Sequence, residues 1–188
     1  VLDANDPAAK FRVIADRQQN IKYYIEHQEN KFYIMTNENA KIFNIMTASV
    51  DDVAKSKWSE YISHSDSIKI EGIDAFKHYL VVYERSGGLQ KIRAIDTQTK
   101  RPQYIQFPDP AYSLYAGENR NYDTPTLRIR YSSLTAPPST FDYDMTSKKL
   151  ELIKQNEIKG YIPADYKMDR VFATATDNVK VPILLVYK

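Results

Sequence analysis

The sequence predicts an all-β protein, built as a partial β-propeller of about three to four blades. Three observations support this: short apolar runs recur at regular intervals, each run has a mate a few residues later, and turn-forming residues lie between them. Their starts are spaced close to the roughly 40 to 50 residues of one propeller blade. The four runs are KFYIMTN from Lys31, HYLVVYE from His78, TLRIRYS from Thr126 and RVFATAT from Arg170.

The mates complete four predicted antiparallel hairpins. Residues that favour tight turns separate each run from its mate. These turn residues are Glu38 and Asn39, Gly87 and Gly88, Pro137 and Pro138, and Asp177 and Asn178. The mates are KIFNIM at Lys41 to Met46, KIRAID at Lys91 to Asp96, STFDYD at Ser139 to Asp144 and VPILLVY at Val181 to Tyr187.

The pattern within the runs indicates how the hairpins pack. FYIM and YLVVY are apolar on both alternating faces, which is typical of a strand between two neighbouring sheets, whereas KIRAID alternates and leaves one face to solvent. The best helical candidate is Thr47 to Lys57, with Ser49 as a possible cap. We interpret it as a one-turn connection between blades.

Composition excludes several classes of protein. The chain has 188 residues, and its net charge of +2 comes from interspersed residues of both signs, so no basic surface for nucleic acid is predicted. No apolar run approaches the roughly 20 residues of a membrane-spanning helix. There is no cysteine, which is compatible with a reducing compartment. With no apolar signal segment at the start, we expect a cytoplasmic protein.

Ser63, His64 and Asp66 form the one close grouping of hydroxyl, imidazole and carboxylate. A catalytic triad needs the imidazole between nucleophile and acid, and neighbouring strand residues point to opposite faces, so we interpret these three as polar turn residues. His27 and His78 lie far from His64, so no metal site is predicted.

Other polar groups also have ordinary explanations. The pairs Asp51 with Asp52 and Asp142 with Asp144 are expected in a polar connection and on a solvated strand face. Gly87 and Gly88 lack the lysine and helix of a phosphate-binding loop, so no cofactor is expected. Five tyrosines offer either a stacking surface for peptide or sugar or, as we favour, packing between blades. They are Tyr104, Tyr112, Tyr115, Tyr122 and Tyr131.

Three segments resemble the prolyl oligopeptidase family of serine peptidases, and within it the oligopeptidase B branch. RYSSLTAPPSTFDYD, within Thr126 to Met145, is the most specific of them. The others are Ile68 to Asp96 and Leu150 to Lys188. The resemblance implies a seven-bladed propeller that covers an α/β-hydrolase domain and restricts entry to short peptides, which are cleaved after basic residues.

The resemblance also implies a division of this chain. Residues 1–168 are expected to form propeller blades, and 169–188 the last propeller strands and the start of the junction to a hydrolase domain that lies beyond Lys188. Every catalytic residue that the family implies would lie there, so none is assigned and the chain alone is expected to be inactive. Its partners would be peptide substrates and that domain. Asn178 and Leu184 depart from the family pattern. An outward-facing Leu184 would enlarge an exposed apolar edge and favour self-association, and an outward-facing Ile42 would do the same.

Two alternatives remain open on the sequence. One is a non-catalytic propeller scaffold that binds peptides or proteins or associates with itself through exposed blade edges. The other is a β-sandwich that binds carbohydrate through its tyrosines, although the regular spacing of the runs argues against a sandwich.

Overall fold

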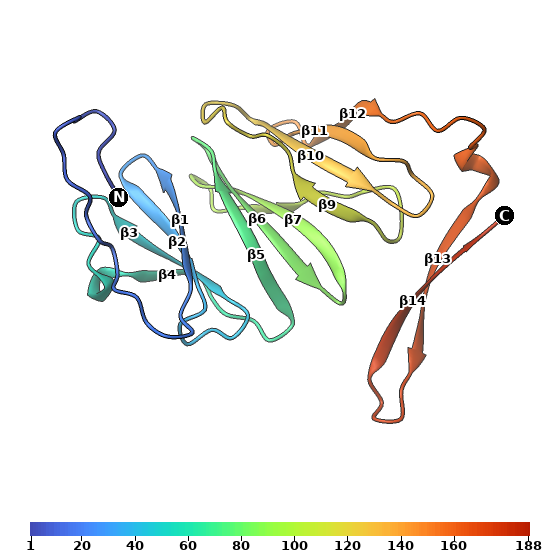
Figure 1. The fold of residues 1–188 in the computed structure, drawn as a ribbon, viewed down its shortest axis with the longest axis horizontal. Coiled ribbons are helices and arrows are strands. Elements are labelled where there is room, and N and C mark those ends of the chain that lie inside the picture. Colours follow the sequence, from blue (N-terminus) through green and yellow to red (C-terminus); the bar gives the residue numbers. More distant parts are fainter.

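The computed structural model describes residues 1–188 as fourteen β-strands and two short 3-10 helices. The strands form three four-stranded antiparallel sheets and one two-stranded hairpin. Figure 1 shows the three larger sheets side by side in chain order, with the hairpin projecting beyond the last of them. The predicted all-β partial propeller is therefore confirmed.

Each four-stranded sheet is a meander in which consecutive strands pair. The first blade contains β1 (Tyr23–Gln28), β2 (Lys31–Thr36), β3 (Asn44–Ser49) and β4 (Ser59–Ile62). The second contains β5 (Ile68–Ala75), β6 (Tyr79–Ser86), β7 (Leu89–Asp96) and β8 (Pro102–Tyr104). The third contains β9 (Ser113–Ala116), β10 (Thr126–Ser132), β11 (Ser139–Asp144) and β12 (Lys149–Gln155). The hairpin is β13 (Lys167–Thr174) with β14 (Lys180–Tyr187).

The predicted runs correspond to β2, β6, β10 and β13, and their mates to β3, β7, β11 and β14. The first mate begins at Asn44 rather than Lys41, because Asn39 and Phe43 have φ angles of 53° and 73° and the residues between them complete the turn. Gly87 and Gly88, with φ of 57° and 78°, supply the left-handed backbone of a two-residue hairpin turn.

The helical candidate is a connection, as interpreted. Its first residues finish β3, and only Lys55–Lys57 form a single 3-10 turn, η1. Ser49 does not cap that turn, because the residue before it is Ala54, which makes no side-chain capping bond. The Ser49 hydroxyl instead accepts a hydrogen bond from the amide of Asp51 at 3.2 Å. The second 3-10 helix, η2 (Pro163–Asp165), lies in the connection to β13.

The core lies between the blades. One apolar cluster joins the first and second blades, and a larger one joins the second and third. Leu80 and Val82 on β6 belong to the first cluster and Val81 to the second, so this strand is buried on both faces as its sequence predicts. On β10 the buried Leu127 and Ile129 alternate with exposed Arg128 and Arg130, so the third blade is covered on one face.

Glutamine side chains add polar links between neighbouring blades. Gln28 donates to the carbonyl of Phe76 at 2.5 Å, which ties β1 to the turn after β5. Gln90 on β7 bonds to both the amide and the carbonyl of Leu114 on β9, at 2.9 and 3.0 Å. These bonds satisfy backbone groups that no strand partner reaches, and they fix the register of one blade against the next.

Candidate functional site

The first and second blades meet at their first strands, where β1 lies against β5. This edge is where a propeller encloses its central channel. A groove of about 610 Å³ lies between the two strands. It is lined by Lys22, Tyr24, Glu26, Met35, Phe43, Lys69, Ile70, Glu71, Gly72 and Ile73. We refer to it as the inner groove, and it is the candidate functional site.

Two carboxylates meet near the inner groove without a basic partner. Glu26 on β1 is half-buried, and neither it nor Asp74 on β5 forms an ion pair within 4.0 Å. Burial, reinforced by the charge of Asp74, raises the pKa of Glu26. Asp74 accepts a 2.7 Å hydrogen bond from the hydroxyl of Tyr83. A carboxylate of the first blade and one of the second therefore lie close to each other where the two blades meet, and their proximity disfavours the charged form of Glu26.

Glu71 also lines the inner groove, and basic side chains neutralise its carboxylate. Glu71 accepts two hydrogen bonds from the guanidinium of Arg85, at 2.8 and 3.2 Å, and lies 3.5 Å from the Lys69 ammonium. Burial would raise the pKa of Glu71, but the hydrogen bond and charge of Arg85, together with Lys69, lower it. Glu71 lies at a bulge, where the register of β5 against β6 shifts between Ile70 and Gly72. Bulges of this kind redirect side chains.

Sequence reasoning did not identify Glu26, Glu71 or Asp74. They lie on strands of different blades, and only folding brings Glu26 beside Asp74. A signal does exist, because IKIEGIDA places charged residues between apolar ones in a strand that lies at the edge of its sheet. Charged residues in such a strand need either a partner or a solvent-filled space.

Ser63, His64 and Asp66 do not form the hydrogen bonds of a catalytic triad. The Ser63 hydroxyl donates to Glu60 at 2.6 Å and not to His64. The Nδ1 atom of His64 lies 3.9 Å from Asp66, which is longer than a hydrogen bond. All three belong to the connection between the first and second blades, where polar turn residues are expected.

The paired aspartates occupy the positions that the sequence predicts. Asp51 and Asp52 lie exposed in the connection after β3. Asp142 on β11 accepts two hydrogen bonds from Arg128 on β10, at 2.8 and 2.7 Å. Asp144 accepts from the amides of the turn that follows β11. Each carboxylate therefore has a local structural partner or free access to water.

The five tyrosines do not form one surface. Tyr131 is buried and stacks on Phe107 with ring centroids 5.5 Å apart, while Tyr112 packs against both rings. Tyr104 donates to the buried Glu84 at 3.0 Å. Tyr115 is 65% exposed and stands alone. Packing between blades therefore accounts for Tyr112 and Tyr131, whereas Tyr104, Tyr115 and Tyr122 are exposed.

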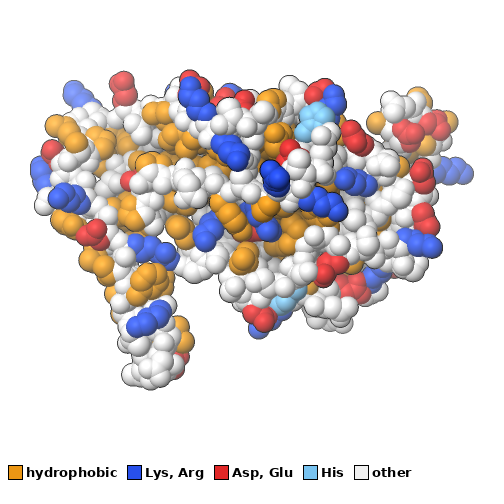
Figure 2. Space-filling view, turned by 180° about the vertical axis from the view of Figure 1, so that it is seen from behind, with side chains coloured by type: hydrophobic (Ala, Val, Ile, Leu, Met, Phe, Trp, Pro, Cys, Tyr) orange, Lys and Arg blue, Asp and Glu red, His pale blue; other side chains and the backbone are white.

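Two further observations concern the molecule as a whole. No group of three or more His, Cys, Asp or Glu side chains is arranged to hold a metal ion. None of the helical segments has the length and apolar character needed to cross a membrane. Figure 2 shows basic and acidic side chains intermixed over the face that it presents.

Comparison with known proteins decides the family. The sequence model described as "Prolyl oligopeptidase, N-terminal beta-propeller domain" matches residues 1–156. The chain belongs to the prolyl oligopeptidase family. The matched residues contain all three four-stranded blades, and the β13–β14 hairpin follows them.

Relatives of the prolyl oligopeptidase family share the sequence along nearly its whole length. Dipeptidyl aminopeptidase BI from Pseudoxanthomonas mexicana is 32% identical over 97% of this chain and 26% of its own length. Protease 2 from Moraxella lacunata is 24% identical over 100% of this chain and 27% of its own. This chain thus spans about a quarter of these curated relatives.

The structure is also similar to a solved member of the family. Oligopeptidase B from Leishmania major superimposes with a TM-score of 0.84 at 28% identity, over 99% of this chain and 28% of that one. The predicted resemblance to the prolyl oligopeptidase family and its oligopeptidase B branch is therefore confirmed.

Proposed function

We propose that this chain is part of the propeller of an oligopeptidase B-like serine peptidase that hydrolyses short peptides after basic residues. In this proposal residues 1–168 form propeller blades, and 169–188 form the last propeller strands and the start of the junction to an α/β-hydrolase domain. That domain contains the catalytic residues, so the chain alone is inactive and none of its residues is catalytic. The parent enzyme needs no cofactor and is cytoplasmic.

The likeness to oligopeptidase B over 99% of the chain supports this proposal most directly. The packing adds a physical reason for restricted access. Apolar clusters and glutamine bonds join each blade to the next, so the blades form a stiff wall. A channel within such a wall admits an extended peptide but is too narrow for a folded domain.

The inner groove is suited to a cationic peptide. Glu26 on β1 and Asp74 on β5 carry negative charge beside the inner groove, and neither forms an ion pair with a basic residue, although Lys22 and Lys69 also line the groove. Carboxylates that have no basic partner attract ligands of the opposite sign, because the surrounding protein focuses their field. A peptide with lysine or arginine side chains would therefore be attracted before it reaches the active site.

The test compares substrates on the longer polypeptide that includes these residues. Fluorogenic peptides with arginine or lysine before the scissile bond should be cleaved at least about tenfold faster than matched alanine peptides, since a positioned charge discriminates by this much. Casein fragments should be cleaved and folded proteins spared. Equal rates for arginine and alanine substrates would contradict the proposed specificity.

The 188-residue chain provides the complementary test. Purified alone, it should not hydrolyse an arginyl ester. Hydrolysis that is lost in the His64→Ala variant would show that the chain has its own active site. It would overturn the proposal that all catalytic residues lie in the hydrolase domain.

A relative's name favours a second candidate activity. The relative at 32% identity is called a dipeptidyl aminopeptidase, which suggests release of dipeptides from a free amino terminus. The same acidic side chains, Glu26 and Asp74, would suit an ammonium group. Peptides with free and acetylated amino termini distinguish the two, because acetylation should abolish dipeptide release and leave cleavage after internal basic residues intact.

The non-catalytic scaffold is the remaining candidate, and the β13–β14 hairpin favours it. Every residue of β14 is exposed, including an apolar stretch from Val181 to Tyr187. Figure 2 shows this hairpin projecting from the body with hydrophobic side chains on its surface. An exposed apolar ribbon favours association with a second copy of the chain.

A further inference from the structure

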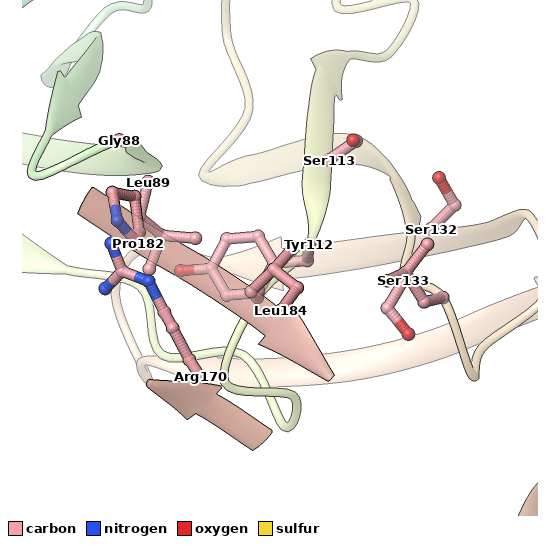
Figure 3. A pocket seen from close by; sticks show the side chains of 11 residues that line it. Gly88, Leu89, Tyr112, Ser113, Ser132, Ser133, Arg170, Pro182 and Leu184 are labelled. Carbon is pink, nitrogen blue, oxygen red and sulfur yellow. The ribbon is translucent and has the colours of Figure 1, made fainter. Parts of the chain in front are cut away.

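A pocket of about 330 Å³ lies where the β13–β14 hairpin meets the ends of the second and third blades. It is separate from the inner groove, with which it shares no residue. Its walls come from the β6–β7 turn, the residues around the start of β9 and the end of β10, and the hairpin (Figure 3). We call it the hairpin pocket. Its polar side chains include Arg170, Tyr112, Ser113, Ser132 and Ser133.

Arg170 brings a positive charge to the hairpin pocket that no carboxylate neutralises. It forms no ion pair within 4.0 Å. One amino group donates to the carbonyl of Gly87, and the guanidinium lies 4.9 Å from the centre of the Phe172 ring. A guanidinium has five N–H donors, so most remain available. The two contacts hold the group in place before any ligand arrives.

Tyr112 supplies a second donor. In Figure 3 its hydroxyl points toward the guanidinium of Arg170. The ring is held by Phe107 and Tyr131, at centroid distances of 5.0 and 5.6 Å. Burial raises the pKa of Tyr112, although the charge of Arg170 opposes this, so the hydroxyl keeps its proton at neutral pH. A fixed cation and a fixed hydroxyl together suit a small anion.

The hairpin pocket also has apolar side chains in its wall. Leu89, Pro182, Leu184 and Leu134 line it, and Leu134 is 62% exposed. A phosphate group would gain little from these side chains and would meet only one basic residue. A carboxylate attached to an apolar side chain uses both parts of the pocket, and its two oxygens match the planar fork of arginine.

We propose that the hairpin pocket binds the free α-carboxylate of a short peptide whose last residue is apolar, with Arg170 and Tyr112 as the donors. The proposal goes beyond the proposed peptidase function, because the hairpin pocket lies outside the inner groove and a peptide bound there is not cleaved. The site would hold peptides by their carboxyl end at the rim of the propeller.

The experiment titrates the 188-residue chain with the tripeptide Gly-Ala-Leu and with its carboxyl-terminal amide, followed by isothermal calorimetry and NMR. The free acid should bind with a dissociation constant on the order of 1 mM, as for a small ligand with one charged contact. The amide should bind at least about tenfold more weakly, because it loses the charge-assisted hydrogen bonds. Equal binding of acid and amide would overturn the proposal.

Three variants locate the site. Arg170→Gln should weaken binding of the acid by about tenfold or more, and Tyr112→Phe by about threefold, since it removes one hydroxyl donor and keeps the Arg170 contact with Gly87. The matched control is Arg130→Gln, which removes an exposed arginine of the third blade that does not line the hairpin pocket. An equal loss in Arg130→Gln would indicate non-specific attraction and would contradict the assignment.

Tyr112→Phe also separates binding from folding. If Arg170→Gln releases the hairpin, its loss of binding has a second explanation, but Tyr112→Phe leaves the hairpin contacts in place. Binding of the acid by Tyr112→Phe that equals the wild type, or no binding by the wild type at about 10 mM peptide, would each overturn the proposal.

Discussion

The hydroxyl of Tyr83 donates a 2.7 Å hydrogen bond to the carboxylate of Asp74 across the first two strands of the second blade. The bond keeps a carboxylate in place beside the half-buried Glu26 of the neighbouring blade. It couples the stability of the blade interface to the charge beside the inner groove, because the same groups contribute to both.

Replacing Tyr83 by phenylalanine should destabilise the chain by about 1 kcal/mol, because the carboxylate of Asp74 loses its donor while the ring packing remains. Urea denaturation at pH 7 measures this. The control is Tyr115→Phe, since Tyr115 is 65% exposed, and its stability should stay within about 0.5 kcal/mol of wild type. Equal effects of the two substitutions would show that the hydrogen bond contributes nothing.

Glu26 and Glu71 should have opposite effects on the pH dependence of stability. The pKa of Glu26 is raised in the folded state, so the folded protein binds its proton more tightly than the unfolded chain does. The stability that this tighter proton binding contributes is present below pH 4.5, the ordinary pKa of a glutamate side chain. It is lost as the pH rises through the pKa of Glu26 in the folded state. Glu26→Gln should therefore stabilise the protein at pH 7 and lose this advantage in acid.

For Glu71 the sign is reversed, because Arg85 and Lys69 outweigh burial and lower its pKa. Its contribution is present above pH 4.5 and is lost as the pH falls through the folded pKa. Glu71→Gln should destabilise the protein at pH 7, and the difference from wild type should shrink in acid. Thermal unfolding of both variants between pH 3 and 8 checks this, and slopes of the same sign would refute the assignment.

The two blade interfaces should respond separately to cavities. Leu80 and Leu127 are both fully buried, the first between the first and second blades and the second between the second and third. Either change to alanine should cost about 2 to 5 kcal/mol. Amide hydrogen exchange should show β2 and β3 less protected in Leu80→Ala, and β10 and β11 in Leu127→Ala. Identical patterns of lost protection would mean that the interfaces unfold as one unit.

Gly117 has no room for a side chain. A Cβ atom there would lie 2.6 Å from Cγ and 2.7 Å from the carbonyl oxygen of Arg128. Gly117→Ala should therefore cost about 1 to 3 kcal/mol by forcing β9 and β10 apart. Gly72 is the matched control, because a Cβ atom there would meet only the ring of Tyr83 at 3.5 Å. Chemical denaturation of the two variants should separate them clearly, and a neutral Gly117→Ala would disprove the close approach.

Self-association through the hairpin predicts a concentration-dependent mass for the 188-residue chain. Changing Ile183 and Leu185 to lysine together should shift the chain toward monomer in sedimentation velocity, because it places charge on the exposed apolar ribbon. Glu151→Lys, which changes charge on the exposed β12, should leave the mass unchanged. A wild-type chain that is monomeric at every concentration would rule out this mode of assembly.

The sequence alone determined the repeating architecture. The runs at Lys31, His78 and Thr126 became the second strands of the three blades, because an apolar strand with a turn and a mate has few ways to bury both faces. Gly87 and Asn178 mark turns for a local reason, since both adopt the left-handed backbone that their residue types tolerate. Spacing, alternation and turn chemistry are local properties, so they could be read directly.

Only the tertiary structure decided which polar residues meet. Glu26 and Asp74 belong to different blades, and the hairpin brings Arg170 to Gly87 and Tyr112 from far along the chain. The bulge at Glu71 further changes which side chains of β5 face the inner groove. Such meetings depend on the stagger and twist of whole sheets against each other, and no short-range pattern in the sequence encodes them.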